Sequence, residues 1–173
     1  MSRRRLELEK ITLKFPHLLE VVFKNRMVKD VAVHIFSKSS GKCIDVHGYS
    51  KNAGGSIVQY SVHGDSNQRW VFEPAGSGFY HIISKHSDKC LDVSGPREDG
   101  FAYVIQNPPD GRDSQKWWLR PVESGYYQII NKQRGDNGLD VQHESQENAA
   151  KIIAHPIHGG DNQKWRLLIA EPL

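Results

Sequence analysis

The chain has 173 residues, of which 38% are hydrophobic and 25% are charged, and its net charge is +3. These values are typical of a folded protein with one domain, and they exclude a fibrous or disordered chain. No apolar run approaches the roughly 18 residues of a membrane-spanning helix, so we expect no insertion into a membrane.

Residues 1–30 differ from the rest of the chain. They hold eight Lys or Arg against four Asp or Glu, which leaves residues 31–173 nearly neutral and without a basic face for nucleic-acid phosphates. The basic start, Met1 to Arg5, is not followed by an apolar stretch, so no secretory signal is seen. We expect a protein that is cytoplasmic or exported without a leader. The apolar content of residues 1–30 predicts an arm that packs on the following domain, or that docks a partner protein or a second copy of the chain.

Three copies of one pattern occupy residues 31–173. A Gln-x-Trp signature and an apolar-Asp-Val segment recur in one register, 47 or 48 residues apart, at Gln68, Gln115 and Gln163 and at Asp45, Asp92 and Asp140. Within each copy, turn residues such as Gly64-Asp65 separate about four short predicted strands. One such unit cannot bury its apolar face alone, so three copies must share a core. The signature tryptophans, Trp70, Trp117 and Trp165, lie in apolar segments and are expected in that core.

Together these motifs resemble the ricin B-type β-trefoil lectin family over about residues 31–171. The resemblance implies an all-β fold, a β-trefoil with pseudo-threefold symmetry, in which three hairpins cap a six-stranded barrel and each repeat offers one sugar pocket. We therefore expect an N-terminal arm over residues 1–30 and a lectin domain over 31–173, with repeats at about 31–77, 78–124 and 125–171.

The two cysteines depart from the family pattern. Cys43 and Cys90 occupy the same repeat position, where the third copy has Gly138. Family members with disulfides pair this cysteine with one further along the same repeat, but Val62, Pro109 and Ile157 stand at those positions. We expect two free thiols packed as small apolar groups.

Sugar binding requires an aromatic face for the C–H groups and a carboxylate that accepts hydrogen bonds from neighbouring hydroxyls. In the first repeat the family resemblance assigns these roles to Asp45, Tyr60 and Asn67, with Gln68 holding the Asp45 carboxylate in place. The third repeat offers Asp140, His155, Asn162 and Gln163, in which an imidazole is the weaker stacking group.

The second repeat is expected to be a weaker pocket. It keeps Asp92 and Gln115, but Asn107 replaces the aromatic residue and Ser114 replaces the asparagine. A structural role also remains open for all three repeats, because the glutamines could satisfy backbone groups and the aspartates could cap turns.

No metal, cofactor or catalytic residue is expected. His155 and His158 suggest a metal pair, but their spacing on a hairpin is not diagnostic and no carboxylate is seen to complete the set. They are interpreted as exposed loop histidines. Nucleophile-elbow, zinc-protease and phosphate-loop motifs are absent, so the chain is predicted not to be an enzyme.

The leading hypothesis is a lectin for galactose- or N-acetylgalactosamine-type glycans, as the family resemblance suggests, with shallow pockets in the first and third repeats. One alternative is a protein-binding β-trefoil, either an inhibitor or a scaffold, which the loss of all three pockets would favour. Another is the glycan- or receptor-binding component of a multi-part toxin.

Overall fold

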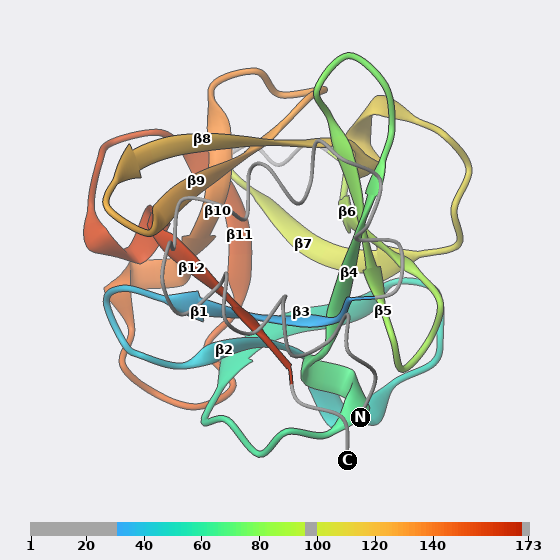
Figure 1. The fold of residues 1–173 in the computed structure, drawn as a ribbon, viewed down its shortest axis with the longest axis horizontal. Coiled ribbons are helices and arrows are strands. Elements are labelled where there is room, and N and C mark those ends of the chain that lie inside the picture. Colours follow the sequence, from blue (N-terminus) through green and yellow to red (C-terminus); the bar gives the residue numbers. More distant parts are fainter. Residues whose placement is uncertain (1–30, 96–99, 171–173) are drawn as a thin grey trace, which may run out of the picture.

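Each repeat contributes four strands to the part of the chain that the computed structural model describes, residues 31–95 and 100–170 (Figure 1). The first repeat forms β1 (Val33–Ser37), β2 (Cys43–Val46), β3 (Gly55–Tyr60) and β4 (Trp70–Pro74). The second forms β5 (Tyr80–Ser84), β6 (Cys90–Val93), β7 (Ala102–Asn107) and β8 (Trp117–Glu123). The third forms β9 (Tyr126–Asn131), β10 (Asn137–Val141), β11 (Ile152–Pro156) and β12 (Trp165–Ile169). The arm predicted over residues 1–30 lies outside the described residues.

Six of the strands, two from each repeat, close into a barrel. β1 pairs with β12 and β4, β4 with β5, β5 with β8, β8 with β9, and β9 with β12, all antiparallel. The ring of pairs returns to its start, so these six strands leave no open sheet edge. Within residues 31–95 and 100–170 there is no helix long and apolar enough to cross a membrane.

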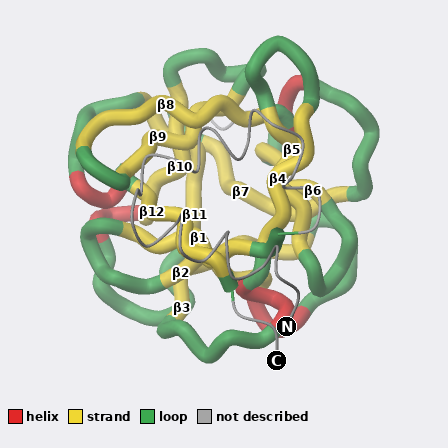
Figure 2. Tube along the Cα trace, viewed as in Figure 1, coloured by secondary structure: helices red, strands yellow, loops and turns green. Residues whose placement is uncertain are grey.

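The other six strands form three hairpins, β2–β3, β6–β7 and β10–β11. Their registers are equivalent, since Cys43 pairs with Tyr60, Cys90 with Asn107 and Gly138 with His155. β7 pairs with both β3 and β11, so the hairpins also contact one another. Figure 2 shows the strands gathered in the centre of this view, with loops around the rim.

The three signature tryptophans lie in the core, as predicted. Each is 0% exposed and begins a barrel strand, namely β4, β8 or β12. Each indole N–H donates to the backbone oxygen of the residue that precedes the repeat's aspartate, at 3.0–3.1 Å, and these residues are Ile44, Leu91 and Leu139. A buried indole N–H needs such a partner, so the tryptophan fixes the aspartate-bearing strand to the barrel.

Cys43 and Cys90 are buried free thiols, which confirms the prediction. Burial raises the pKa of each thiol to about 12, because a buried thiolate loses its solvation. At Gly138 an added Cβ would lie 2.6 Å from Cδ1 of Ile157. Ile157 therefore fills the space that a side chain would need at this position in the third repeat.

Candidate functional site

Each Gln-x-Trp signature joins a 3₁₀ turn to a barrel strand. The turns are Ser66–Gln68, Asp113–Gln115 and Asp161–Gln163. All three glutamines are 0% exposed, and their side chains reach the hairpin of the same repeat. This arrangement brings the glutamine to the aspartate near the start of that hairpin.

In the first repeat three side chains converge on Asp45. Gln68 Nε2 donates to Asp45 Oδ2 at 2.9 Å and Asn67 Nδ2 donates to Oδ1 at 3.0 Å. His63 Nε2 lies 3.3 Å from Oδ2. The carboxyl is buried, and this burial raises its pKa against the lowering effect of Gln68 and His63.

Gln68 combines the two roles that the sequence left open. Besides its bond to Asp45, Nε2 donates to the backbone oxygen of Ser61 at 3.0 Å, and Oε1 accepts from the backbone N–H of His63 at 2.9 Å. The side chain therefore orients the carboxylate and also holds the loop that carries His63. Gln163 acts in the same way on Asp140 and on the backbone N–H of His158.

The hairpin register places Tyr60 on the same face as Asp45. Tyr60 pairs with Cys43 and Asp45 with Val58, and residues two apart in a strand point to the same side. Tyr60 is 38% exposed, and its ring lies edge-on to His63 with 6.1 Å between centroids. Tyr49, half exposed, also lies near His63, with 6.1 Å between the ring centroids.

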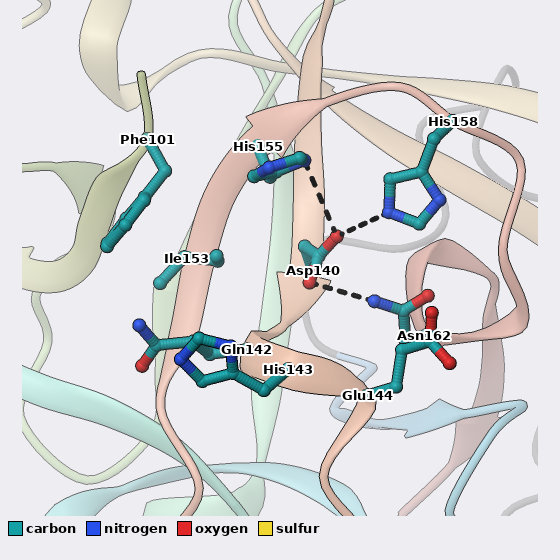
Figure 3. Close-up of a pocket in the computed structure, with 9 residues that line it drawn as sticks. All are labelled: Phe101, Asp140, Gln142, His143, Glu144, Ile153, His155, His158 and Asn162. Carbon is teal, nitrogen blue, oxygen red and sulfur yellow. Dashed lines mark hydrogen bonds and ion pairs between the residues drawn. The ribbon is translucent and has the colours of Figure 1, made fainter. Parts of the chain in front are cut away.

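The third repeat builds the same set around Asp140 (Figure 3). Gln163 Nε2 donates to Asp140 Oδ2 and Asn162 Nδ2 donates to Oδ1, both at 2.9 Å. His158 Nε2 lies 3.1 Å from Oδ2, and His155 Nδ1 lies 4.0 Å from the same oxygen. Burial also raises the pKa of the Asp140 carboxyl.

An open pocket of about 310 Å³ lies in front of Asp140, and its lining includes His155, His158, Asn162 and Phe101. Phe101 belongs to the second repeat and reaches the pocket because Ala102 pairs with Ala154 across β7 and β11. Figure 3 shows its ring on one side of the pocket, with His158 and Asn162 on the other. The third pocket therefore has an apolar wall that its own repeat does not supply.

The second repeat uses its aspartate differently. Asn107 Nδ2 donates to Asp92 Oδ2 at 2.9 Å, while Asn107 Oδ1 accepts from the backbone N–H of Gly54 at 3.0 Å. Gln115 Nε2 donates to Asp92 Oδ2 at 3.2 Å. The residue at the expected stacking position thus bonds to the carboxylate itself, in place of an aromatic ring.

The prediction that no carboxylate joins His155 and His158 is wrong. Ligand atoms of both histidines and of Asp140 all lie within 4.8 Å of one another. The reason is the register of β10 and β11, which pairs Gly138 with His155 and so puts Asp140 on the same face as that histidine.

Sequence reasoning missed His63, Tyr49 and Phe101. It placed His155 and His158 in an exposed loop, which is correct for His158, whereas His155 lies on β11 and is partly buried. A signal for His63 and His158 exists, because a His-Gly pair precedes the signature glutamine by five residues in the first and third repeats only. Phe101 carries no such signal, since it acts on a pocket of another repeat.

Comparison with known proteins agrees with this architecture. The family model described as the ricin-type beta-trefoil lectin domain matches residues 31–165, whereas a search of curated proteins finds no match. Among solved structures, the designed threefold-symmetric protein ThreeFoil is 36% identical, with a TM-score of 0.76 over 79% of this chain and 97% of that chain.

Two natural proteins are also similar. The exo-β-1,3-galactanase 1,3Gal43A from Clostridium thermocellum is 29% identical, with a TM-score of 0.77 over 81% of this chain but only 30% of the enzyme. The C-half of the earthworm R-type lectin, solved in complex with GalNAc, is 25% identical, with a TM-score of 0.64 over 80% of this chain and 98% of that chain. By its repeated motifs, its closed barrel with three hairpins and the match of the family model, this chain belongs to the ricin-type β-trefoil lectin family.

Proposed function

We propose that this protein binds galactose- or N-acetylgalactosamine-type glycans reversibly, through the pockets of the first and third repeats. The observation that carries the proposal is the set of Asp, Asn, Gln and His built twice with matching distances. In both copies the glutamine and the asparagine hold the two carboxylate oxygens at 2.9–3.0 Å. Such a carboxylate is oriented before the ligand arrives, which reduces the entropic cost of binding.

The carboxylate supplies the polar half of sugar recognition. An ionised carboxylate has about four lone-pair positions, and the amide groups of Asn67 and Gln68 occupy two of those on Asp45. His63 Nε2 approaches a third position at 3.3 Å. A sugar hydroxyl binds at a position left free or in place of His63, and such a hydrogen bond is strong because the acceptor is charged. His63, only 31% exposed at its side chain, adds a ring nitrogen at the edge of the same pocket.

The aromatic residues supply the apolar half. Tyr60 in the first repeat is exposed on the face that carries Asp45, and the C–H face of a sugar stacks on such a ring. In the third repeat His155 takes the Tyr60 position and Phe101 adds a second apolar surface. Each of the two pockets therefore has its own held carboxylate, and the two differ in the aromatic groups on which a sugar would stack.

The choice of sugar rests on the family and on one relative, the earthworm lectin half solved in complex with GalNAc. Open, shallow pockets of this kind give weak single-site binding, and a millimolar Kd corresponds to only about 4 kcal/mol. Two pockets on one chain raise the apparent affinity for a surface that displays many glycans. The function is binding, with no covalent step.

Titration of the protein with GalNAc, followed through the side-chain amide NMR signals, tests this function. We expect shifts at Asn67 and Gln68 and at Asn162 and Gln163, because these amides hold the two carboxylates. The amides of Asn107 and Gln115 serve as the internal control and should not move. If millimolar galactose and GalNAc shift none of the four site amides in the folded protein, the proposal is wrong.

A further inference from the structure

The third repeat brings together three metal-ligating groups from two strands and a loop. Asp140 lies on β10, His155 on β11, and His158 in the loop that follows. His158 Nε2 is 3.1 Å and His155 Nδ1 is 4.0 Å from Asp140 Oδ2, and all three atoms lie within 4.8 Å of one another. Figure 3 shows both imidazoles turned toward the carboxylate.

These separations approach those of a metal site. Zinc binds histidine nitrogen and carboxylate oxygen at about 2.0–2.2 Å, which places the ligand atoms of a tetrahedron roughly 3.4 Å apart. The pair of His158 and Asp140 already meets this spacing, and His155 needs a side-chain adjustment of about 1 Å to do so. Gln163 and Asn162 hold the carboxylate from behind, as outer partners of metal ligands do.

We propose that Asp140, His155 and His158 bind a divalent transition-metal ion, and that zinc suits this donor set best. Two imidazoles and one carboxylate are common zinc ligands, and three protein ligands leave a fourth position open toward the pocket of about 310 Å³. Water can occupy that position.

Two existing contacts oppose the metal and limit its affinity. His155 Nδ1 lies 3.0 Å from the backbone oxygen of Pro156, and His158 Nδ1 accepts from the backbone N–H of Gly160 at 3.2 Å. A metal on His155 Nδ1 replaces the proton that this nitrogen donates to Pro156. A metal on His158 Nε2 requires the tautomer with the proton on Nδ1, which then no longer accepts from Gly160. We therefore expect weaker binding than at a closed structural zinc site with four protein ligands.

The first repeat is a built-in control for this site. Asp45 and His63 repeat the carboxylate and the loop histidine with a separation of 3.3 Å, but Tyr60 stands where the third repeat has His155. The first repeat therefore has two of the three ligands. His155→Tyr should convert the third site to the first repeat's composition, and Tyr60→His should complete a second metal site.

The metal and the sugar compete for Asp140 Oδ2, a consequence that rests on the proposed function. Zinc should lower glycan binding in the third repeat and leave the first repeat unchanged. Zinc binding would therefore change the protein from a form with two glycan-binding pockets to a form with one.

Zinc titration of the full-length protein against a chromophoric chelator, without sugar, tests the metal site directly. We expect one site in the wild-type protein, binding at least tenfold weaker in His155→Tyr and in His158→Gln, and two sites in Tyr60→His. Cobalt(II) in place of zinc should give the visible absorption of a low-coordinate site with nitrogen ligands. Equal zinc affinity in the wild-type protein and both loss variants, with unchanged thermal unfolding, would overturn the inference.

A separate NMR arm with GalNAc tests the competition. Zinc should suppress the GalNAc-induced shifts of Asn162 and Gln163 and leave those of Asn67 and Gln68 intact. Unsuppressed shifts in zinc-loaded protein would disprove competition. A protein that binds zinc as predicted but never responds to GalNAc would disprove the proposed function and leave the metal site standing.

Discussion

At the scale of single residues, the sequence predicts the carboxylates and their glutamines well and the histidines poorly. The family resemblance implies the contact of Gln68 with Asp45, which is formed at 2.9 Å, and Gln163 makes the equivalent contact with Asp140 at 2.9 Å. His63 reaches Asp45 only because Gln68 binds the loop backbone and sets the path of that loop. A contact that depends on loop shape leaves little trace in residue type, and here the one trace is the His-Gly pair five residues before the signature glutamine.

The raised pKa of Asp45 predicts that glycan binding weakens in mild acid. The charged carboxylate is the hydrogen-bond acceptor, and its pKa lies above the ordinary value of 3.8 because of burial. The glycan affinity should therefore be at its full value at a pH well above the raised pKa of Asp45, and it should fall as the pH drops through that pKa. The Asp140→Ala variant removes the carboxylate of the third pocket, so its glycan affinity reports on the first pocket alone. This affinity is measured from neutral pH down to about pH 4. Constant affinity over this range would contradict the expectation.

The buried thiols should be almost unreactive in the native protein. A pKa of about 12 for Cys43 and Cys90 leaves very little of the reactive thiolate near neutral pH. We expect a coloured thiol reagent to label the two cysteines at least about a hundredfold more slowly in buffer than in denaturant. Rapid labelling of the folded protein would show that one of the hairpins opens.

At the scale of elements, the repeat spacing predicts the strands, because equivalent segments of the three copies must form equivalent strands with equivalent strand pairings. The hairpin register determines the rest of the site, since it places Tyr60 and His155 on the face of Asp45 and Asp140. Sequence patterns indicate that strands exist but leave a one-residue slip open, and such a slip turns every side chain to the other face. The tryptophan bonds from barrel to hairpin remove that freedom.

Trp117→Phe tests this anchoring in the repeat that lacks a proposed pocket. The change leaves the buried backbone oxygen of Leu91 without its 3.0 Å donor. An unsatisfied buried acceptor costs about 1–3 kcal/mol, and the smaller ring also loses packing in the core, so the free energy of unfolding in urea should fall by at least about 1 kcal/mol. GalNAc binding by the folded variant should stay unchanged. An unaltered unfolding curve would show that the indole bond does not stabilise the hairpin.

At the scale of the whole molecule, three similar repeats differ in the side chains that surround the aspartate. The first and third repeats combine a held carboxylate with neighbouring rings, while in the second repeat Asn107 bonds to the carboxylate and to Gly54. Neighbouring repeats also complete one another's surfaces, as Phe101 does for the third pocket. The sequence predicts which polar side chains each repeat carries, because each repeat is read alone. It does not predict such shared walls, because they depend on how β7 and β11 pair.

The most direct test of the central claim is a glycan array probed with the wild-type protein, the double variant Asp45→Ala/Asp140→Ala, and Asp92→Ala as the matched control. Two pockets acting together should give the wild-type protein clear binding to galactose- or N-acetylgalactosamine-terminated glycans. Asp92→Ala should keep that binding, and the folded double variant should lose it. Binding that survives in the double variant, or that is lost in Asp92→Ala alone, would contradict the account.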